Sequence, residues 1–279
     1  ENIIEARFLE ATELGSIENE VSTISNELSE QLVSAYNKGW LWLSPTWDMP
    51  RSIYWKDDEW IKGIRLNRSE YEAFFYGTQI LKQIQTPLQS LVLKEMFAPI
   101  QNVEAKKNMR PTSFETIYGI PYFTPLTKGR PPEIFEKFKV LKEIKRAEDI
   151  SDNDLHLELL SGIQGKTIPD LTDEYRLTII YYSGILQRGD IHIRGQIEDI
   201  VPSVAYELQR IIKKLVKRPF LQIAQKLNIP EDQLQYTRFK VSHLPTLLSN
   251  AYGPGYIWST LQAVFHRKPI SLKRVTKQT

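Results

Sequence analysis

The chain has no cysteine among its 279 residues, which excludes disulfides, thiolate metal sites and cysteine nucleophiles. The lack of cysteine also fits a reducing cytoplasm. No apolar run reaches membrane-spanning length and no signal peptide is evident, so we expect a cytoplasmic protein. The hydrophobic fraction of 41% and the charged fraction of 25% are ordinary for a globular chain. The length allows one large domain or two small ones.

Motifs of the common enzyme classes are also missing. There is no glycine-rich phosphate loop, no Gly-x-Ser-x-Gly motif and no His-Glu-x-x-His motif. The four histidines show no metal-ligand spacing, so we expect neither a metal nor a cofactor. Asp190 and His192 would share one strand face, as a general base, as metal ligands or as two solvated polar side chains. Because the solvated arrangement is the commoner one, we expect no enzyme.

Charge is segregated along the chain, although the net charge is only +2. Residues 1–35 hold eight Glu and one Arg, whereas residues 210–226 hold six basic residues and no acidic one. Residues 236–279 hold seven basic residues and again no acidic one. Aromatic residues are interleaved with this basic charge. The pattern favours a polyanionic partner, above all nucleic acid, over a solvated face or a charged subunit contact.

The clearest local signals lie between Tyr175 and Lys217. Residues 176–183 are β-branched and aromatic, which predicts a strand. Residues 190–197 alternate between apolar and polar, which predicts a second strand. Its isoleucines are expected to face inward, namely Ile191, Ile193 and Ile197. Ser203 is suited to cap a helix that runs to about Lys217. The apolar face of that helix would be Val204, Leu208, Ile211, Ile212 and Leu215, and basic residues extend from it.

Weaker patterns predict the other elements. We expect extended segments at residues 2–9, 40–43 and 114–123. We expect helices at residues 16–39, 69–84, 87–97, 133–147, 151–160 and 259–265. The first of these helices would carry an acidic face of Glu18, Glu20, Glu27 and Glu30, and a capping box from Ser69 to Glu72 would open the second. Tryptophans between residues 40 and 60 either close a core or stack on unpaired bases, and the core is the commoner use.

These elements define an α+β fold, in which antiparallel sheets or hairpins pack with several helices and the C-terminal portion is helical and basic. We expect an N-terminal α+β region at residues 1–130. The central hairpin and the basic helical region would follow at residues 131–279, or the whole chain would be one domain.

Basic side chains in loops and on the expected helix are the candidates for phosphate contacts. Asn108 and Arg130 are also candidates for reading a base edge, because amide and guanidinium groups match base edges. The complete set is Lys106, Lys107, Asn108, Arg110, Lys128, Arg130, Arg188, Lys213, Lys214, Lys217, Arg218, Arg267, Lys268, Lys273 and Arg274.

Residues 220–234 offer an alternative. Their pattern of two short helices around a turn is similar to a helix-turn-helix, which would make the protein a DNA-binding transcription regulator. The pattern is short, and such apolar spacing is common in helices that only form part of a core.

Three segments of the central region carry a family resemblance. Residues 181–184 (Tyr-Tyr-Ser-Gly), 189–193 (Gly-Asp-Ile-His-Ile) and 197–203 (Ile-Glu-Asp-Ile-Val-Pro-Ser) resemble the central region of the large subunit of type I-B CRISPR Cascade complexes. The resemblance covers about the middle quarter of the chain.

The resemblance implies a non-catalytic subunit of an RNA-guided antiviral surveillance complex. Such a subunit helps to hold the end of the guide RNA and recognises the protospacer-adjacent motif (PAM) of double-stranded target DNA. It works beside other Cascade subunits and helps to recruit a separate helicase-nuclease. The resemblance transfers no individual PAM-reading residue to this chain.

Overall fold

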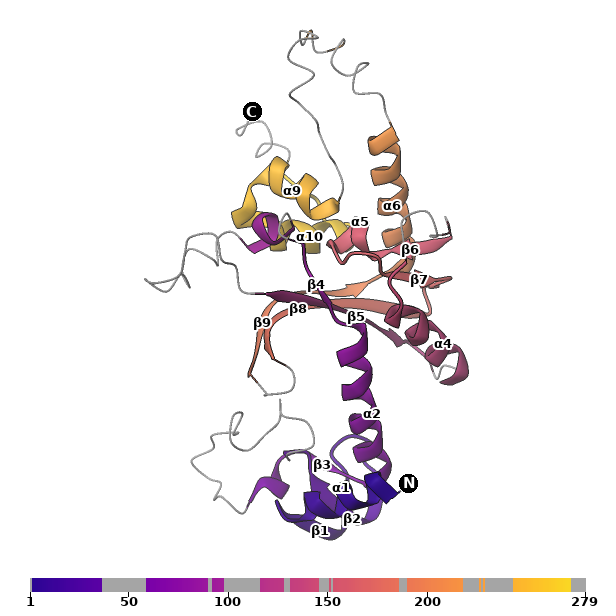
Figure 1. Cartoon of the computed structure of the whole chain (residues 1–279), viewed down its shortest axis with the longest axis vertical. Coiled ribbons are helices and arrows are strands. Elements are labelled where there is room, and N and C mark those ends of the chain that lie inside the picture. The colour runs from indigo at the N-terminus through magenta and orange to yellow at the C-terminus, as the bar shows by residue number, and fades with distance from the viewer. Residues whose placement is uncertain are drawn as a thin grey trace, which may run out of the picture. The chain divides into compact units, whose positions relative to one another are not determined.

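The computed structural model describes residues 2–36, 59–89, 92–97, 116–127, 131–145, 151, 153–185, 190–217, 226, 228 and 243–271 (Figure 1). Contacts divide the chain into two compact units. One comprises Glu1–Gln83 with Ser183–His192, and the other comprises Ile84–Tyr182 with Ile193–Thr279. This division differs from the expected one at residue 130. Strand β5 (Ile117–Pro125) lies between β4 (Thr86–Pro87) and β8 (Tyr175–Ile185) in one sheet, which joins residues on both sides of position 130.

The first unit combines a three-stranded antiparallel sheet with two helices. Its elements are α1 (Asn2–Thr12), β1 (Ser16–Val21), β2 (Leu28–Ser34), the 3-10 helix η2 (Trp60–Lys62), β3 (Arg65–Leu66) and α2 (Arg68–Ile84), with strand order β1-β2-β3. The core gathers Phe8, Ala11, Val33, Leu66 and Tyr71. Trp60 is buried, so the structural use expected for the tryptophans is confirmed at this position.

Two expectations for the first unit are wrong. Residues 2–12 form a helix and not a strand, because Ile4, Phe8 and Ala11 recur at helical spacing and are buried. Residues 16–34 form a hairpin and not a helix, with β1 and β2 paired from Ser16↔Val33 to Val21↔Leu28. The helical spacing of its apolar residues was misleading because several of them face solvent.

The capping residue of helix α2 lies two residues before the predicted one, Ser69. Asn67 caps it, since the Asn67 Oδ1 atom accepts a hydrogen bond from the Glu70 N–H at 2.9 Å and the Glu70 carboxylate accepts one from the Asn67 N–H at 2.9 Å. This reciprocal pair is a capping box. The predicted pair Ser69–Glu72 has the right spacing, but Ser69 already lies within the helix.

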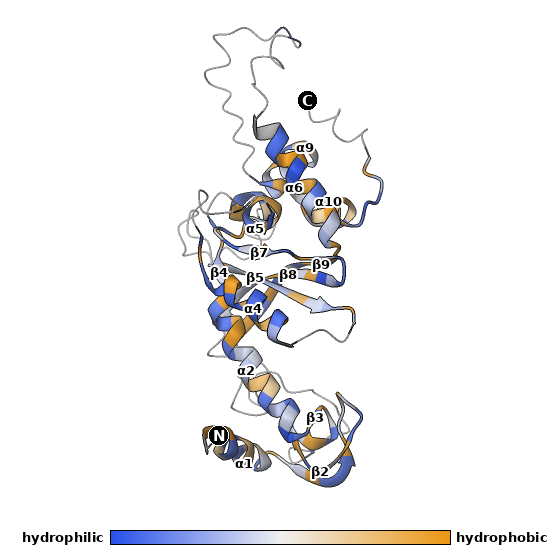
Figure 2. Cartoon of the chain, turned by 90° about the vertical axis from the view of Figure 1, so that its right-hand side faces the viewer, coloured by the Kyte–Doolittle hydropathy of each residue, from blue (hydrophilic) through white to orange (hydrophobic). Residues whose placement is uncertain are grey.

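The second unit is built around a four-stranded sheet in the order β4-β5-β8-β9, where β9 is Asp190–Ile200. The other elements are α4 (Pro131–Lys142), β6 (Asp154–His156), α5 (Leu157–Ser161), β7 (Thr167–Pro169), α6 (Pro202–Lys217), α9 (Leu244–Tyr252), the 3-10 helix η5 (Pro254–Tyr256) and α10 (Ile257–Phe265). Strands β6 and β7 form a separate antiparallel pair. Helices α5, α6, α9 and α10 lie on one side of the larger sheet (Figures 1 and 2).

Aromatic side chains join this sheet to the helices. Tyr181 of β8 is fully buried and donates a hydrogen bond to the Ser161 carbonyl at 2.9 Å. Burial raises the pKa of its phenol, so it stays a neutral donor. The ring of Trp258 in α10 lies 5.4 Å from that of Tyr181 and 5.3 Å from that of Phe97. The second core therefore lies between the sheet and these helices.

The α+β class and the antiparallel hairpins are confirmed, as are the two central strands and the helix that follows them. Residues 257–265 are also helical, close to the expected helix. The prediction that the isoleucines of β9 face inward is partly wrong, because Ile197 is fully buried but Ile193 is 64% exposed. Strand β9 is at the edge of its sheet, where one end can lie beyond the covering helices.

Other boundaries also shift. Of the expected helix at residues 87–97, residues 92–97 are helical, whereas Pro87 belongs to the short strand β4 and residues 88–89 are not helical. The expected helix at 151–160 is the strand β6 followed by the short helix α5. The aromatic strand at 40–43 and the helix-turn-helix pattern at 220–234, apart from Lys226 and Asn228, lie outside the described residues.

Candidate nucleic-acid interface

Helix α6 is amphipathic, and its start is well defined. Pro202 occupies the first helical position, where its missing N–H costs no hydrogen bond. The Asp173 carboxylate accepts a hydrogen bond from the Ser203 N–H at 2.8 Å. The hydrogen bonds from Ser203 lower the pKa of Asp173, so the carboxylate is charged at neutral pH. A negative charge at a helix N-terminus is also favourable for the helix dipole.

The faces of α6 differ from those predicted. Ala205, Gln209 and Ile212 are buried, whereas Leu208 is half-buried and Ile211 is 47% exposed. The apolar face is therefore turned toward Ala205 and Gln209. Hydrophilic and hydrophobic residues alternate along this helix in Figure 2. The exposed residues include Arg210 and Lys214, which lie away from the buried face.

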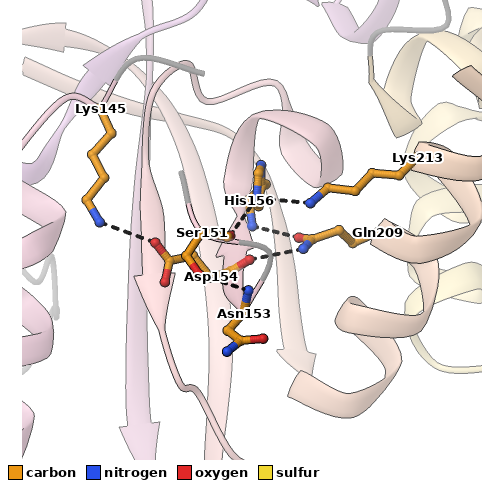
Figure 3. Close-up of polar contacts among 7 residues, drawn as sticks. All are labelled: Lys145, Ser151, Asn153, Asp154, His156, Gln209 and Lys213. Atoms are coloured by element: carbon orange, nitrogen blue, oxygen red, sulfur yellow. Dashed lines mark hydrogen bonds and ion pairs between the residues drawn. The ribbon is translucent and has the colours of Figure 1, made fainter. Parts of the chain in front are cut away.

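The buried residue Gln209 fixes the rotation of α6 by binding the backbone of β6. Its Oε1 atom accepts a hydrogen bond from the His156 N–H at 2.7 Å, and its Nε2 atom donates one to the Asp154 carbonyl at 3.0 Å. Figure 3 shows this amide beside β6. Strand β6 pairs with β7 from Asp154↔Pro169 to His156↔Thr167, and Gln209 adds two side-chain hydrogen bonds to the backbone of the same strand.

One turn further along α6, Lys213 reaches the same strand. Its Nζ atom lies 3.3 Å from the Nε2 atom of His156, which also lies 3.3 Å from the Ser151 carbonyl oxygen (Figure 3). A neutral imidazole has one donor and one acceptor nitrogen. If Nε2 is the acceptor it binds Lys213, and if Nε2 carries the proton it donates to Ser151. The hydrogen bond between Lys213 and His156 therefore forms only in the tautomer of His156 whose Nε2 atom carries no proton.

Asp154 completes this polar cluster from the side of α4. Its carboxylate accepts a hydrogen bond from the Lys145 Nζ atom at 3.2 Å, and its side chain is 10% exposed. In this cluster, Asp154 and His156 of β6 bind Lys145 and Lys213, which come from other parts of the chain. In the described part of the chain, no group of His, Asp and Glu side chains has the arrangement of a metal site.

A groove of about 410 Å³ runs beside α6. It is lined by Val204, Glu207, Leu208, Ile211, Val264 and Arg267. The Arg267 guanidinium donates a hydrogen bond to the Glu207 carboxylate at 2.7 Å. This ion pair joins the end of α10 to α6, so Arg267 lies close to the basic helix although it is far away in sequence.

Of the predicted contact residues, four have described side chains. Lys213 is half-buried, while Lys214, Arg267 and Lys268 are exposed. Lys213 and Lys214 thus lie on α6, and Arg267 lies next to this helix because it binds Glu207. For Lys217 only the backbone is described, at the end of α6. The others lie outside the described residues, namely Lys106, Lys107, Asn108, Arg110, Lys128, Arg130, Arg188, Arg218, Lys273 and Arg274.

The enzyme alternative gains no support from its two residues. His192 is exposed on β9, and the side chain of Asp190 lies outside the described residues. Among the described residues, no helix has the length and apolar character needed to cross a membrane.

Sequence reasoning missed the contacts of His156 and Gln209. The two residues are far apart in the chain, and neither belongs to a known motif. One signal did exist: Gln209 lies between Ala205 and Ile212 at helical spacing, on the buried face of the helix. A polar residue at such a position needs a buried partner.

A second polar pair and a buried lysine lie near this cluster. The His243 Nε2 atom lies 3.6 Å from the Glu158 carboxylate, and the hydrogen bond from His243 is the main cause that lowers the pKa of Glu158. Lys166 is 2% exposed and donates a hydrogen bond to the Leu141 carbonyl at 2.5 Å. Burial lowers the pKa of this amine. The first arrangement joins the start of α9 to α5, and the second joins the residue before β7 to the end of α4.

Comparison with known proteins gives no relative: no family model, no curated protein and no solved structure matches the chain. The class of the protein therefore rests on its fold, and its function is a matter for proposal.

Proposed function

We propose that the chain is a non-catalytic nucleic-acid-binding protein whose phosphate contacts come from the outward face of α6. One observation carries the proposal: Gln209 anchors the buried face of α6, which turns Arg210 and Lys214 to solvent. Neither side chain forms an ion pair within the described part of the chain, and no acidic residue occurs in the sequence from 210 to 226. Cations displayed in this way neutralise phosphates and release their counterions.

We propose further that the protein works as the large subunit of an RNA-guided CRISPR complex in the cytoplasm. The support is the resemblance of residues 181–184, 189–193 and 197–203, most of which fall on β8, β9 and the start of α6. In this role the protein binds guide RNA and the PAM of double-stranded DNA beside other Cascade subunits, and it helps to recruit a helicase-nuclease. Base pairing by the guide would supply most of the sequence specificity.

The test of α6 is a pair of charge variants. Arg210→Ala/Lys214→Ala removes two exposed cations from α6. The control, Lys139→Ala/Lys142→Ala, removes two exposed cations from α4, of which Lys139 is paired with Glu136. Binding to short duplex DNA and to single-stranded RNA is measured across a series of salt concentrations. For the α6 variant, we expect the slope of log K against log salt to become shallower by about 1.8 for duplex and about 1.4 for single strands.

The control variant is expected to keep the wild-type slope. Equal losses in both variants would mean that α6 supplies only general charge, and an unchanged slope in the α6 variant would refute its role. Purification from the source cells tests the assembly separately. A stoichiometric short RNA with several proteins supports the complex, whereas a lone protein that binds one duplex sequence tightly favours a transcription regulator.

A further inference from the structure

The hairpin tip of the first unit, residues 21–28, displays apolar side chains to solvent. Leu28 is 74% exposed, Ile24 is 52% exposed and Val21 is 37% exposed. Val21 and Leu28 are directly opposite each other in the β1–β2 register, so they form one patch together with the turn that connects them. Single exposed apolar residues are common on protein surfaces, but three within one turn need an explanation.

Hydrogen bonds hold the turn itself in place. The Ser22 hydroxyl accepts hydrogen bonds from the Ile24 N–H at 3.3 Å and the Ser25 N–H at 3.0 Å. Ser22 also donates from its backbone to the Glu27 carbonyl at 3.0 Å. Asn26 has a φ of 59°, a left-handed conformation that asparagine tolerates well. The turn therefore has a defined shape.

Hydrogen bonds from helix α2 and strand β3 also fix the position of this turn. The Glu70 carboxylate accepts hydrogen bonds from the Ser22 hydroxyl at 2.7 Å and from the Ser25 N–H at 2.9 Å. The Thr23 N–H donates a hydrogen bond to the Arg65 carbonyl at 3.0 Å, and the Arg65 N–H donates one to the Thr23 hydroxyl at 2.9 Å. Since Glu70 also caps α2, the start of the helix and the hairpin tip share one carboxylate. Exposed apolar residues on so rigid a support lose little conformational entropy on binding.

The same hairpin carries exposed acidic residues, and Glu27 directly precedes Leu28. Glu18, Glu27 and Glu30 are exposed, and within the described part of the chain they form no ion pair. Glu20 is the exception, with its carboxylate 3.7 Å from the Arg65 guanidinium. In Figure 2 the hairpin is largely hydrophilic with hydrophobic positions. Exposed apolar side chains with carboxylates on the same hairpin match the composition of protein interfaces, which have an apolar core and a polar rim.

We propose that the hairpin tip docks into a partner protein, in an apolar recess whose rim carries lysine or arginine. Ile24 and Leu28 enter the recess, and Glu27 and Glu30 face the basic rim. Charge complementarity selects this occupant: nucleic acid and anionic lipid are repelled by the same glutamates. The inference goes beyond nucleic-acid binding by α6 and stands if that proposal fails, because every residue it uses lies in the first unit.

Site-specific photo-crosslinking tests the docking. The full chain is produced in its source cells with a photoreactive phenylalanine analogue in place of Ile24, or in place of Leu9 as the control. Leu9 is 56% exposed on α1, so the two probes are matched in exposure. Crosslinked residues of any partner are then mapped by mass spectrometry. A charge variant, Glu27→Lys/Glu30→Lys, is compared with Glu143→Lys/Glu174→Lys, which reverses two exposed carboxylates in the second unit.

The expected result is a crosslink from position 24 to one protein, at aliphatic residues flanked by lysine or arginine. The yield should fall at least tenfold in Glu27→Lys/Glu30→Lys and stay unchanged in Glu143→Lys/Glu174→Lys. Leu28→Asp should reduce it similarly, because it places a charge in the apolar recess. Crosslinks to nucleic acid, to lipid or to a second copy of the chain overturn the proposal. It is also overturned by equal crosslinking yields from positions 24 and 9, or by a yield that is unchanged in Glu27→Lys/Glu30→Lys.

Discussion

The indole of Trp258 lies directly against the backbone of Gly195, so that a methyl group on this glycine would be 2.5 Å from the Cη2 atom of the ring. Gly195 is in the edge strand β9, and Trp258 is in α10. The same indole contacts the rings of Phe97 and Tyr181. The close approach therefore lets α10 pack on the sheet, and the absence of a side chain at position 195 is a steric requirement.

We predict that Gly195→Ala destabilises the second unit by about 1–3 kcal/mol, because the indole must move within a packed core. Gly77→Ala is the matched control. Gly77 lies inside α2 with open space around its Cα atom, so the alanine should stabilise the helix by about 0.5–1 kcal/mol. Urea denaturation followed by circular dichroism measures both. A stable Gly195→Ala variant would mean that α10 packs differently.

We predict that Gln209→Leu separates α6 from β6. The substitution leaves the His156 N–H and the Asp154 carbonyl without their partner, at a cost of about 2–4 kcal/mol. Hydrogen exchange of the His156 amide gives a specific readout, since this proton is protected by Gln209. It should exchange much faster in the variant, and nucleic-acid binding should weaken. Gln196→Leu, at an exposed position of β9, should change neither quantity.

We predict that the buried amine of Lys166 makes stability depend on pH in the alkaline range. Its folded-state pKa is lowered by burial, whereas the unfolded chain keeps the ordinary value of 10.5. Between these two values the unfolded state binds more protons, so the stability of the folded state rises with pH.

The variant that tests this is Lys166→Met, which has an unbranched side chain one atom shorter and removes the charge. The free energy of unfolding of the wild type, minus that of the variant, should increase from pH 7 to pH 10. Lys214→Met, at an exposed site, should show no such trend. A constant difference for Lys166→Met would show that the amine is charged and solvated in the folded protein.

The parts of the fold that could be predicted are those with continuous local signals. Strands β8 and β9 and helix α6 follow one another with unbroken patterns, so their existence and order were clear from the sequence. The β1–β2 hairpin was mistaken for a helix because Val21, Ile24 and Leu28 recur at helical spacing. These residues face solvent, and a pattern in the sequence cannot distinguish an exposed apolar residue from a buried one.

The candidate site was predicted only as a charge pattern. Lys213 and Lys214 were identified because basic residues cluster in α6, which is a local property of the sequence. The partners that orient them, His156 and Gln209, come together only through the packing of α6 on β6. Such long-range contacts leave no spacing rule in the sequence. The buried polar position of Gln209 indicates that the side chain has a hydrogen-bond partner, but it does not indicate which residue that partner is.

The last prediction concerns Glu70, which joins the start of α2 to the hairpin tip. Its carboxylate is partly buried, which by itself raises the pKa, but hydrogen bonds from Ser22, Asn67 and Ser25 outweigh this effect and lower it. A lowered pKa means that the folded state favours the charged form. The resulting stabilisation is fully present above the ordinary value of 4.5, and it is lost as the pH falls through the lowered folded-state value.

Glu70→Gln should therefore destabilise the first unit at pH 7, and the difference from the wild type should shrink as the pH approaches 3. Glu72→Gln on the same helix is the control, with no difference expected at either pH. Hydrogen exchange of the Ser25 amide, which binds the Glu70 carboxylate, follows the hairpin tip directly. The protection factor of this amide, which is its intrinsic exchange rate divided by the observed rate at the same pH, should fall in Glu70→Gln at neutral pH and in the wild type only under acid conditions. If Ser25 exchange is unaffected while α2 is destabilised, Glu70 acts as a helix cap alone and the rigidity of the hairpin tip has another origin.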